Sequence, residues 1–511
     1  MASRILGLLR DQVLAFYFGA GDAMDAFRVA FRVPNLARDL FAEGAMSAAF
    51  VPTFTHELTT GGKPRGWALA NSVITALILI TGVLVAAGAV FAEPLVRLFA
   101  PDFADIPGKI ELTILMARIM VPFLTLVALA AVFMGMLNAL GHFFIPALSP
   151  AMFNVATILI VVLCVPLAPA IGVQPIVLVA IATLVGGLGQ LVIQWRPLRR
   201  EGYSYRPHID FRDPSLRRVL LLMGPGTIGM AATQINVLVN TQFAAGEGTG
   251  AVSWLDYAFR LMYLPIGLFG VSIAAASTPA LSRLAAVGDT ARMRATVASA
   301  IGLMLVLNLP ATVGLMVLAI PIVGLIFEHG RFTPADTVAT ARALQLYAIG
   351  LVAYSVVRIV SPAFYALRSS RIPVAASIIS VVVNIALNIV LVRVMGYAGL
   401  ALGTSLAAIV NAAVQLVLLR RRLDGIDGQR IMLTFVKVVA AAITMGAVAW
   451  YAEAVLNQSF PGASVPLQAA RLTVVIVVSL GVLTAAAAIL RLREFYEARD
   501  MVLGRLRRLN R

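Results

Sequence analysis

Long apolar runs constrain this chain more than any other feature. Hydrophobic residues make up 60% of its 511 positions and charged residues only 13%, with a mean hydropathy of +0.93. A soluble domain is about 45–50% apolar. Because a helix needs about 20 residues to cross a bilayer, the runs predict an all-α polytopic membrane protein with about 14 transmembrane helices. The predicted spans are 2–20, 26–56, 67–93, 111–139, 143–167, 172–195, 215–243, 250–278, 295–327, 337–366, 371–394, 397–419, 431–456 and 466–490.

Basic residues between these runs predict the orientation. Connections after the even-numbered spans hold about 25 Lys and Arg, whereas those after the odd-numbered spans hold about four, and basic loops stay in the cytoplasm. Both termini are therefore expected to be cytoplasmic. The net charge of +16 is assigned to loops that meet membrane lipids, not to nucleic-acid binding. The basic tail 491–511 is expected to be a cytoplasmic interfacial segment.

An internal repeat divides the chain. The motif at Ala30, Phe31 and Arg32 recurs 228 positions later as Ala258, Phe259 and Arg260, and Ile145-Pro146 recurs 227 positions later as Ile372-Pro373. Matches in one register indicate duplication. Six helices per half make both halves start in the cytoplasm, so we expect two pseudo-symmetric six-helix lobes around a central cavity. The expected segments are a first lobe at 1–200, a basic cytoplasmic loop at 201–214, a second lobe at 215–422, two extra helices at 431–490 and the tail.

Charged residues gather in the first fifty positions, within otherwise apolar sequence. Arg10, Asp11, Arg38, Asp39 and Glu43 are the expected inner members of this cluster. A charge at the bilayer centre costs about 2.5–3.5 kcal/mol on insertion scales and marks function. Because a guanidinium binds phosphate or carboxylate through two parallel hydrogen bonds, the arginines predict an anionic ligand.

Several segments carry a family resemblance. The stretch SRILGLLRDQVLAFYFGAGDAMDAF, the following FRVPNLARDLFAEGAMSAAFVP, the later GAVSWLDYAFRLMYLPIGLFGV and the two extra C-terminal helices closely resemble the MurJ/MviN lipid II flippases of the MOP exporter superfamily. The resemblance implies transport of undecaprenyl-pyrophosphoryl-disaccharide-pentapeptide to the outer leaflet of the inner (plasma) membrane by alternating access. It also implies a role in peptidoglycan synthesis, beside other cell-wall synthesis proteins, and a lipid-tail groove at 431–490.

The resemblance assigns roles to individual residues. Arg10, Arg38 and Arg260 match a pyrophosphate-binding triad, and a lipid-linked pyrophosphate needs fixed cations because it loses water inside the membrane. The residues expected to support or gate this site are Arg4, Asp11, Asp25, Arg28, Arg32, Asn35, Asp39, Glu43 and Ser253.

The acids and the N-terminal arginine carry more specific expectations. Asp11 is expected to point away from Arg10. Asp25 forms either a gate pair with Arg28 or Arg32 or a simple helix N-terminal charge. For Arg4, snorkelling to headgroups is an equal alternative to a functional role.

Proline and glycine mark candidate bends. Pro34 lies in the second predicted span, and Gly224, Pro225 and Gly226 lie in the seventh. They are expected either to act as hinges for alternating access or to be ordinary packing kinks.

The sequence predicts neither a cofactor, nor a metal site, nor an enzyme. The four histidines lack metal-ligand spacing, and no phosphate loop or nucleophile motif appears. Asn240 and Asn388 occupy positions where some relatives are expected to bind sodium through acids. Neutral amides favour interhelical hydrogen bonding over a hard-cation site.

Three other functions compete with this one. A multidrug or metabolite cation antiporter of the same superfamily predicts twelve helices and an acid-dominated cavity, and a non-transporting scaffold gives no reason for central arginines. A flippase for another polyprenyl-linked saccharide shares the lipid and the pyrophosphate, so it stays an alternative.

The first span begins almost at Met1, which suggests a late start assignment or a truncated chain.

Overall fold

The computed structural model describes residues 2–39, 45–210, 212–462, 464–492 and 494–496. Side chains at 2, 37, 45–48, 171 and 222–233 lie outside this description. All regular structure among the described residues is helical, as predicted. The chain divides into two compact units, residues 1–253 with 329–332 and residues 254–328 with 333–511.

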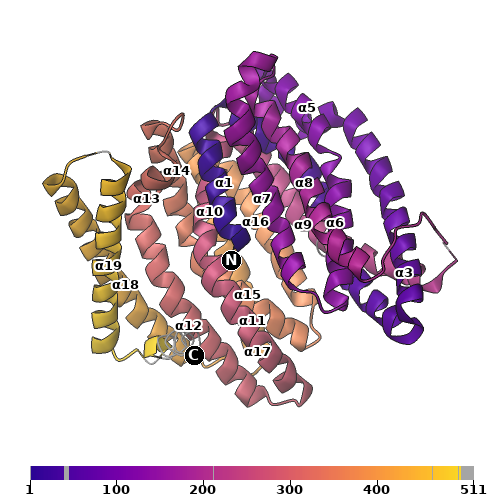
Figure 1. Ribbon diagram of the computed structural model, residues 1–511. Helices are drawn as coiled ribbons and strands as arrows, with labels where there is room; N and C mark the ends of the chain where they lie inside the picture. Colours follow the sequence, from indigo (N-terminus) through magenta and orange to yellow (C-terminus); the bar gives the residue numbers. More distant parts are fainter. Residues whose placement is uncertain (1, 40–44, 211, 463, 493, 497–511) are drawn as a thin grey trace. The chain divides into compact units, whose positions relative to one another are not determined.

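The first unit holds a series of helices followed along the chain in Figure 1. They are α1 (Ala2–Phe18), α2 (Asp22–Arg38), α3 (Ala45–Val90), α4 (Ala92–Phe99), η2 (Pro101–Asp105), α5 (Lys109–Met120), α6 (Phe123–Ala139), α7 (Phe144–Cys164), η3 (Val165–Ile171), α8 (Pro175–Arg200) and α9 (Pro214–Ala245). Phe50, Phe54 and Leu69 of α3 are buried in its core against Trp67 and Tyr203. The backbone of α3 breaks at Gly62, whose φ of 70° suits glycine.

The second unit continues from α10, which starts at the end of the first. Its helices are α10 (Ala251–Pro265), η4 (Ile266–Gly270, a π-turn), α11 (Val271–Ala286), α12 (Thr290–Val317), α13 (Ala319–Phe327), α14 (Pro334–Ile349), α15 (Leu351–Ala366), α16 (Arg371–Met395), α17 (Tyr397–Arg422), α18 (Gly428–Ser459) and α19 (Val465–Ile489). Thr333 and Asp336 form a capping box at the start of α14, which satisfies N–H groups that a helix start leaves without partners. The last two helices form a hairpin that packs on α12 and α13 (Figure 1).

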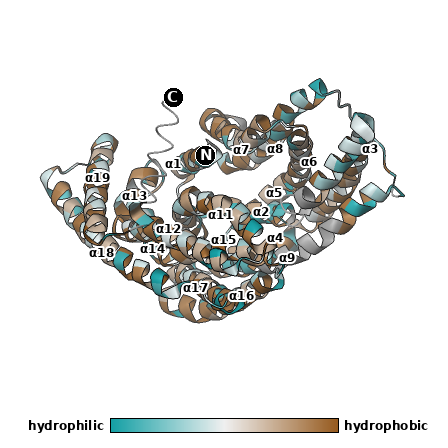
Figure 2. Ribbon diagram, turned by 90° about the horizontal axis from the view of Figure 1, so that it is seen from below, coloured by the Kyte–Doolittle hydropathy of each residue, from teal (hydrophilic) through white to brown (hydrophobic). Residues whose placement is uncertain are grey.

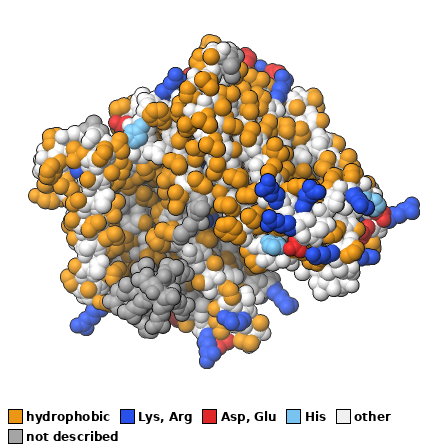
Figure 3. Space-filling model, viewed as in Figure 1, with side chains coloured by type: hydrophobic (Ala, Val, Ile, Leu, Met, Phe, Trp, Pro, Cys, Tyr) orange, Lys and Arg blue, Asp and Glu red, His pale blue; other side chains and the backbone are white. Residues whose placement is uncertain are grey.

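The predicted spans correspond to helices or broken helices. Among described residues, ten helical segments are long and apolar enough to cross a membrane, and the count rises to eleven if α14 and α15, bent by 41°, form one span. At 17 residues each, α1 and α2 are shorter than those segments. Hydrophobic residues recur along the helices (Figure 2) and dominate the surface in view (Figure 3). The chain is therefore a multi-pass membrane protein, and the count of fourteen is compatible with the structure.

The predicted lobe boundary is not tested by this division. Helix α9, placed by the sequence in the second lobe, packs on α3 and α4 within the first unit. The lobes at 1–200 and 215–422 therefore stay a prediction.

Close helix packing in the second unit gives a stability prediction. A Cβ added at Gly399 would overlap the backbone of α16 at Leu391, whereas one added at Gly481 on α19 would meet open space. Gly399→Ala should destabilise the α16 and α17 hairpin by at least about 2 kcal/mol. The backbone atoms of Leu391, unlike those of a side chain, cannot rotate out of contact with the added methyl group. Thermal unfolding of the purified protein in detergent measures this. Gly481→Ala is the control, and an equal unfolding midpoint for both variants would contradict the packing argument.

Candidate functional site

Arg10 and Asp11 form a buried ion pair on α1. The guanidinium of Arg10 donates from Nε and Nη2 to Asp11 Oδ1 at 3.2 and 2.9 Å. Arg28 of α2 brings its Nη2 to 3.8 Å from the same oxygen. The exposed fractions are 7% for Arg10, 1% for Asp11 and 6% for Arg28. The expectation that Asp11 points away from Arg10 was wrong, because the long arginine side chain reaches the carboxylate of the next residue.

A stacked pair of aromatic rings lies beside this charge. Arg10 Cζ lies 5.2 Å from the centroid of the Phe153 ring on α7, and Phe153 stacks on Phe31 with centroids 5.9 Å apart. Rings exclude water and attract a cation through their faces. Two arginines against one carboxylate give the trio of Arg10, Arg28 and Asp11 a net charge of one positive unit, a favourable setting for an anion.

Arg38 and Asp39 repeat the same geometry at the end of α2. Arg38 donates from Nε and Nη2 to Asp39 Oδ1 at 3.1 and 2.8 Å. Gln234 of α9 donates to the other carboxylate oxygen at 3.2 Å. The side chains of Arg38 and Asp39 are 26% and 28% exposed. At both positions, the aspartate that follows the arginine accepts hydrogen bonds from the Nε and Nη2 edge of its guanidinium.

Arg260 lies on α10 in the second unit. Its Nε donates to Asp256 Oδ2 at 3.1 Å, one helical turn earlier, and the side chains are 36% and 18% exposed. Sequence reasoning missed Asp256, although its spacing four residues before Arg260 was a readable signal. All three predicted arginines are therefore held by a carboxylate on their own helix.

Other predicted residues lie in varied settings. Arg4 is exposed on α1, Arg32 and Asn35 are partly buried on α2, and α2 continues through buried Pro34 without a break. Glu43 lies outside the described residues. Gly224, Pro225 and Gly226 lie within helix α9, in the stretch whose side chains are not described. The hinge assignments stay predictions.

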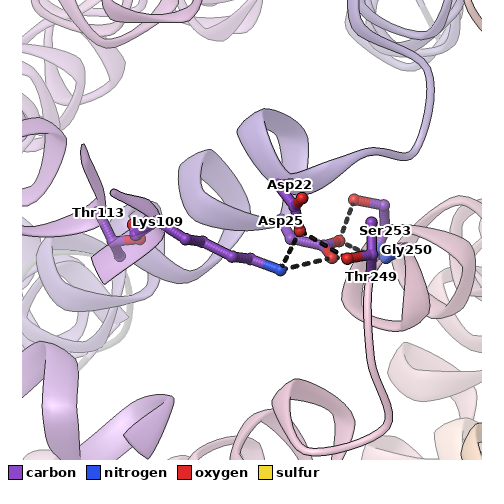
Figure 4. A network of polar contacts seen from close by, with 7 residues as sticks. All are labelled: Asp22, Asp25, Lys109, Thr113, Thr249, Gly250 and Ser253. Atoms are coloured by element: carbon purple, nitrogen blue, oxygen red, sulfur yellow. Dashed lines mark hydrogen bonds and ion pairs between the residues drawn. The ribbon is translucent and has the colours of Figure 1, made fainter. Parts of the chain in front are cut away.

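A second polar site surrounds Asp25 near the start of α2 (Figure 4). Asp25 is fully buried. Its Oδ2 accepts from the Gly250 N–H at 2.7 Å and lies 3.4 Å from Lys109 Nζ. Its Oδ1 accepts from the N–H and the Oγ–H of Ser253 at 3.0 and 2.6 Å. The carboxylate therefore caps the start of α10, where N–H groups and the helix dipole favour a negative charge.

Lys109 completes the site from α5. Its Nζ donates to Asp22 Oδ1 at 2.7 Å, and that oxygen also accepts from Thr249 Oγ1 at 2.7 Å. The ammonium lies 4.0 Å from the centroid of the Phe103 ring, and Lys109 is 3% exposed. We call Asp22, Asp25, Lys109, Thr249, Gly250 and Ser253 the Asp25 hub.

The hub corrects the predicted gate pair. The cation at Asp25 is Lys109, not Arg28 or Arg32, because α5 brings its first residue against the first turn of α2. Ser253, expected to support gating, is a direct partner of Asp25. Sequence reasoning missed Lys109 because 84 positions separate it from Asp25, and no local periodicity connects them.

The asparagines of α16 lie in a packed interface. Asn388 Nδ2 lies 3.3 Å from Asn384 Oδ1, and Asn384 Nδ2 lies 3.5 Å from Thr404 Oγ1 of α17. Asn384 and Asn388 are 1% and 0% exposed. The second of these contacts joins α16 to α17, as predicted for the amides, whereas the first lies within α16. For Asn388 and Asn240, interhelical hydrogen bonding stays a prediction.

A third polar cluster joins the break within α3 to the residues that follow α6 and α8. Glu201 is 2.8 Å from His142 Nε2 and 2.9 Å from Lys63 Nζ. Hydrogen bonds from His142 and then from Lys63 lower the pKa of Glu201 below its ordinary value. The cluster joins three connections that are predicted, from their basic residues, to be cytoplasmic.

The buried pair at Asp25 gives a stability prediction. Lys109→Met should lower the free energy of unfolding by about 3–5 kcal/mol, because it leaves the buried carboxylate of Asp25 without its cation. Lys63→Met removes the exposed ion pair with Glu201 and should lower the free energy of unfolding by no more than about 1 kcal/mol. Thermal unfolding of each variant in detergent measures the difference, and the double variant Asp25→Asn, Lys109→Met should recover part of the loss. Equal effects of the two lysine variants would refute the role of Lys109.

The chain matches one protein family over most of its length. The family model described as "Lipid II flippase MurJ" matches residues 14–470. A "Probable lipid II flippase MurJ" of Bdellovibrio bacteriovorus is 36% identical over 449 residues, covering 87% of this chain and 84% of the relative. A "Lipid II flippase MurJ" of Burkholderia cenocepacia is 33% identical, with 88% of each chain covered.

Solved structures give the same picture. A lipid II flippase MurJ in an inward closed conformation is similar with a TM-score of 0.77 and 26% identity, over 98% of each chain. An inward-facing multidrug resistance MATE family transporter of the MOP superfamily has a TM-score of 0.67 at 18% identity, covering 83% of this chain and 94% of that one, which shows the fold alone. With carboxylate-held arginines on α1, α2 and α10 and a family match over most of its length, this chain belongs to the MurJ lipid II flippase family.

Proposed function

We propose that this protein moves lipid II from the cytoplasmic to the periplasmic leaflet of the inner membrane for peptidoglycan synthesis, as a transporter and not as an enzyme. The observation that carries the proposal is the set of arginines at Arg10, Arg38 and Arg260, each held by an adjacent or i−4 carboxylate. Both termini are proposed to be cytoplasmic, on the basis of the Lys and Arg distribution.

The carboxylates suit a site that must be empty for part of a cycle. A guanidinium inside the membrane is costly without a counter-charge, most of all when it is buried as Arg10 is. Asp11, Asp39 and Asp256 therefore stabilise the arginines when no substrate is bound. A pyrophosphate brings about two negative charges and binds guanidinium groups through charge-assisted hydrogen bonds. The local pairs fix the guanidinium orientations in advance, which lowers the entropy cost of binding.

Alternating access requires contacts that form and break. We propose that the Asp25 hub closes the outer side, because it joins the first turn of α2 to α5, to the connection between α9 and α10, and to the first turn of α10. At one stage of the proposed cycle, Arg260 meets the pyrophosphate together with Arg10 and Arg38. The hub is lost when the outer side opens.

The energy source is proposed to be the membrane potential. Moving one charge through 100 mV is worth about 2.3 kcal/mol, and the substrate carries negative charge. The amides of Asn384 and Asn388 serve helix packing in this proposal, and neutral amides are weak ligands for a hard cation.

Removal of each arginine tests the pyrophosphate site. Arg10→Ala, Arg38→Ala and Arg260→Ala should each lower the rate of lipid II transfer about 10- to 100-fold, since a hydrogen bond to a charged group contributes about 1.5–3 kcal/mol. Lysine at these positions should restore only part of the rate, because it lacks the bidentate geometry. The rate is measured in proteoliposomes with fluorescently labelled lipid II and an impermeant quencher.

Arg97→Ala is the matched control for these variants. Arg97 pairs with Glu93 on the surface of α4, and both side chains are 50% exposed. Its rate should stay within about twofold of the unmodified protein, because exposed pairs contribute little. Full activity in all three site variants would remove the basis of the proposal.

Ion dependence tests the proposed energy source. In the same vesicles, replacing sodium by potassium on both sides should leave the rate within about twofold, whereas an imposed potential of about 100 mV should change it severalfold. Asn388→Ala should lower the unfolding midpoint without creating sodium dependence. Strong sodium dependence of the unmodified protein would contradict this view of the amides.

A further inference from the structure

A cavity of about 190 Å³ lies beside the last helical hairpin, and no step of the proposed transport uses it. Its walls come from α13, α18 and α19 of the second unit. These three helices are labelled in Figure 1. At about 30 Å³ per water, it has room for roughly six waters, enough for a small polar group. The cavity is lined by charged groups of both signs, Glu328, Glu453 and Arg471, and by the amides of Asn457 and Gln468.

The charges in this cavity are held apart. Arg471 donates from Nη1 to Asn457 Oδ1 at 2.6 Å and to the Phe460 carbonyl at 3.1 Å, and from Nη2 to the Gly462 carbonyl at 2.9 Å. These oxygens are neutral, so they position the guanidinium without cancelling its charge. Glu328 accepts a hydrogen bond from Thr337 at 2.6 Å, which likewise leaves its negative charge in place.

No ion pair joins Arg471 to Glu328 or Glu453 in the described part of the second unit. Opposite charges within one cavity normally pair with each other, because pairing offsets the cost of removing them from water. Their separation therefore suits a ligand that carries both signs. With two carboxylates and one arginine, the lining has a net charge of one negative unit and disfavours a ligand with net negative charge.

Aromatic side chains place the cavity at the membrane interface. Trp450, Tyr451 and Phe460 of α18 and its following loop are 66%, 67% and 56% exposed. Tryptophan and tyrosine gather at the level of lipid headgroups. Glu453 and Asn457 lie on α18 between these aromatic residues, so the cavity opens at headgroup level.

An apolar floor lies next to the charged groups. Leu472 and Val475 of α19 line the cavity and belong to a buried cluster with Leu318 and Ala449. Ile320, 53% exposed, lines the same cavity. A ligand here meets charge at one side and hydrocarbon at the other, as a phospholipid does at the interface.

We propose that this cavity binds the headgroup of a zwitterionic phospholipid with a primary amine, of the phosphatidylethanolamine class. Glu328 and Glu453 accept hydrogen bonds from the ammonium group, Arg471 faces the phosphate, and the acyl chains leave along Leu472 and Ile320. A primary ammonium has three N–H donors for these acceptors. A trimethylammonium has none, and a glycerol headgroup has no positive charge.

Lipid binding to the purified full-length chain tests this assignment. Native mass spectrometry can titrate the protein with dioleoylphosphatidylethanolamine, dioleoylphosphatidylcholine and dioleoylphosphatidylglycerol. We expect the ethanolamine lipid to bind about tenfold more tightly than either of the others, because it alone forms charge-assisted hydrogen bonds with both acids. Equal binding of the ethanolamine lipid and either of the other two overturns the proposal, even if no variant can be purified.

Variants locate the preference within the cavity. The double variant Glu328→Gln, Glu453→Gln keeps the side-chain shapes and should reduce the preference to less than about twofold. Glu111→Gln is the control, because Glu111 is exposed on α5, and it should keep the full preference. A preference that survives in the double variant refutes the assignment. Because binding is measured without transport, this result is independent of the lipid II proposal.

Discussion

The structure depends on one constraint, that a charge removed from water inside a membrane bundle must be stabilised by the protein itself. Arg10 shows how the chain meets this constraint. Its guanidinium lies against the next residue, Asp11, and the same carboxylate oxygen approaches Arg28 of α2. The pair is available as soon as α1 forms, since both members are adjacent in sequence. Arg38 with Asp39 and Arg260 with Asp256 follow the same rule.

This local pairing separates two requirements that a transporter must meet. In the proposed cycle, the arginines must be stable while the site is empty, and they must also bind an anion strongly when it arrives. A counter-charge on the same helix satisfies the first requirement without tying the helix to a neighbour. Helices that carry their own counter-charges can change partners at a lower free-energy cost, as the proposed alternating access requires.

The Asp25 hub uses the opposite arrangement. Its members come from α2, α5, the connection before α10 and the first turn of α10, so Asp25 is stabilised only while these segments stay together. Asp25 is a fully buried carboxylate with four polar contacts. Moving the segments apart breaks all four contacts together, so the hub is satisfied only in this one arrangement of the segments. The arginines proposed to bind pyrophosphate and the proposed outer closure thus differ in whether the counter-charge is local or distant.

The sequence by itself determined the helical membrane class, the family and the positions of the cationic residues. Hydrophobic runs of about 20 residues form membrane-spanning helices. An arginine within such a run can be identified from the sequence alone. The tertiary structure decided which acid meets which base. Lys109 reaches Asp25 across 84 positions, and Arg471 is held by the loop that follows α18. Such contacts depend on how helices pack, and packing depends on side-chain shape at many positions together, which no local pattern of hydrophobicity or charge records.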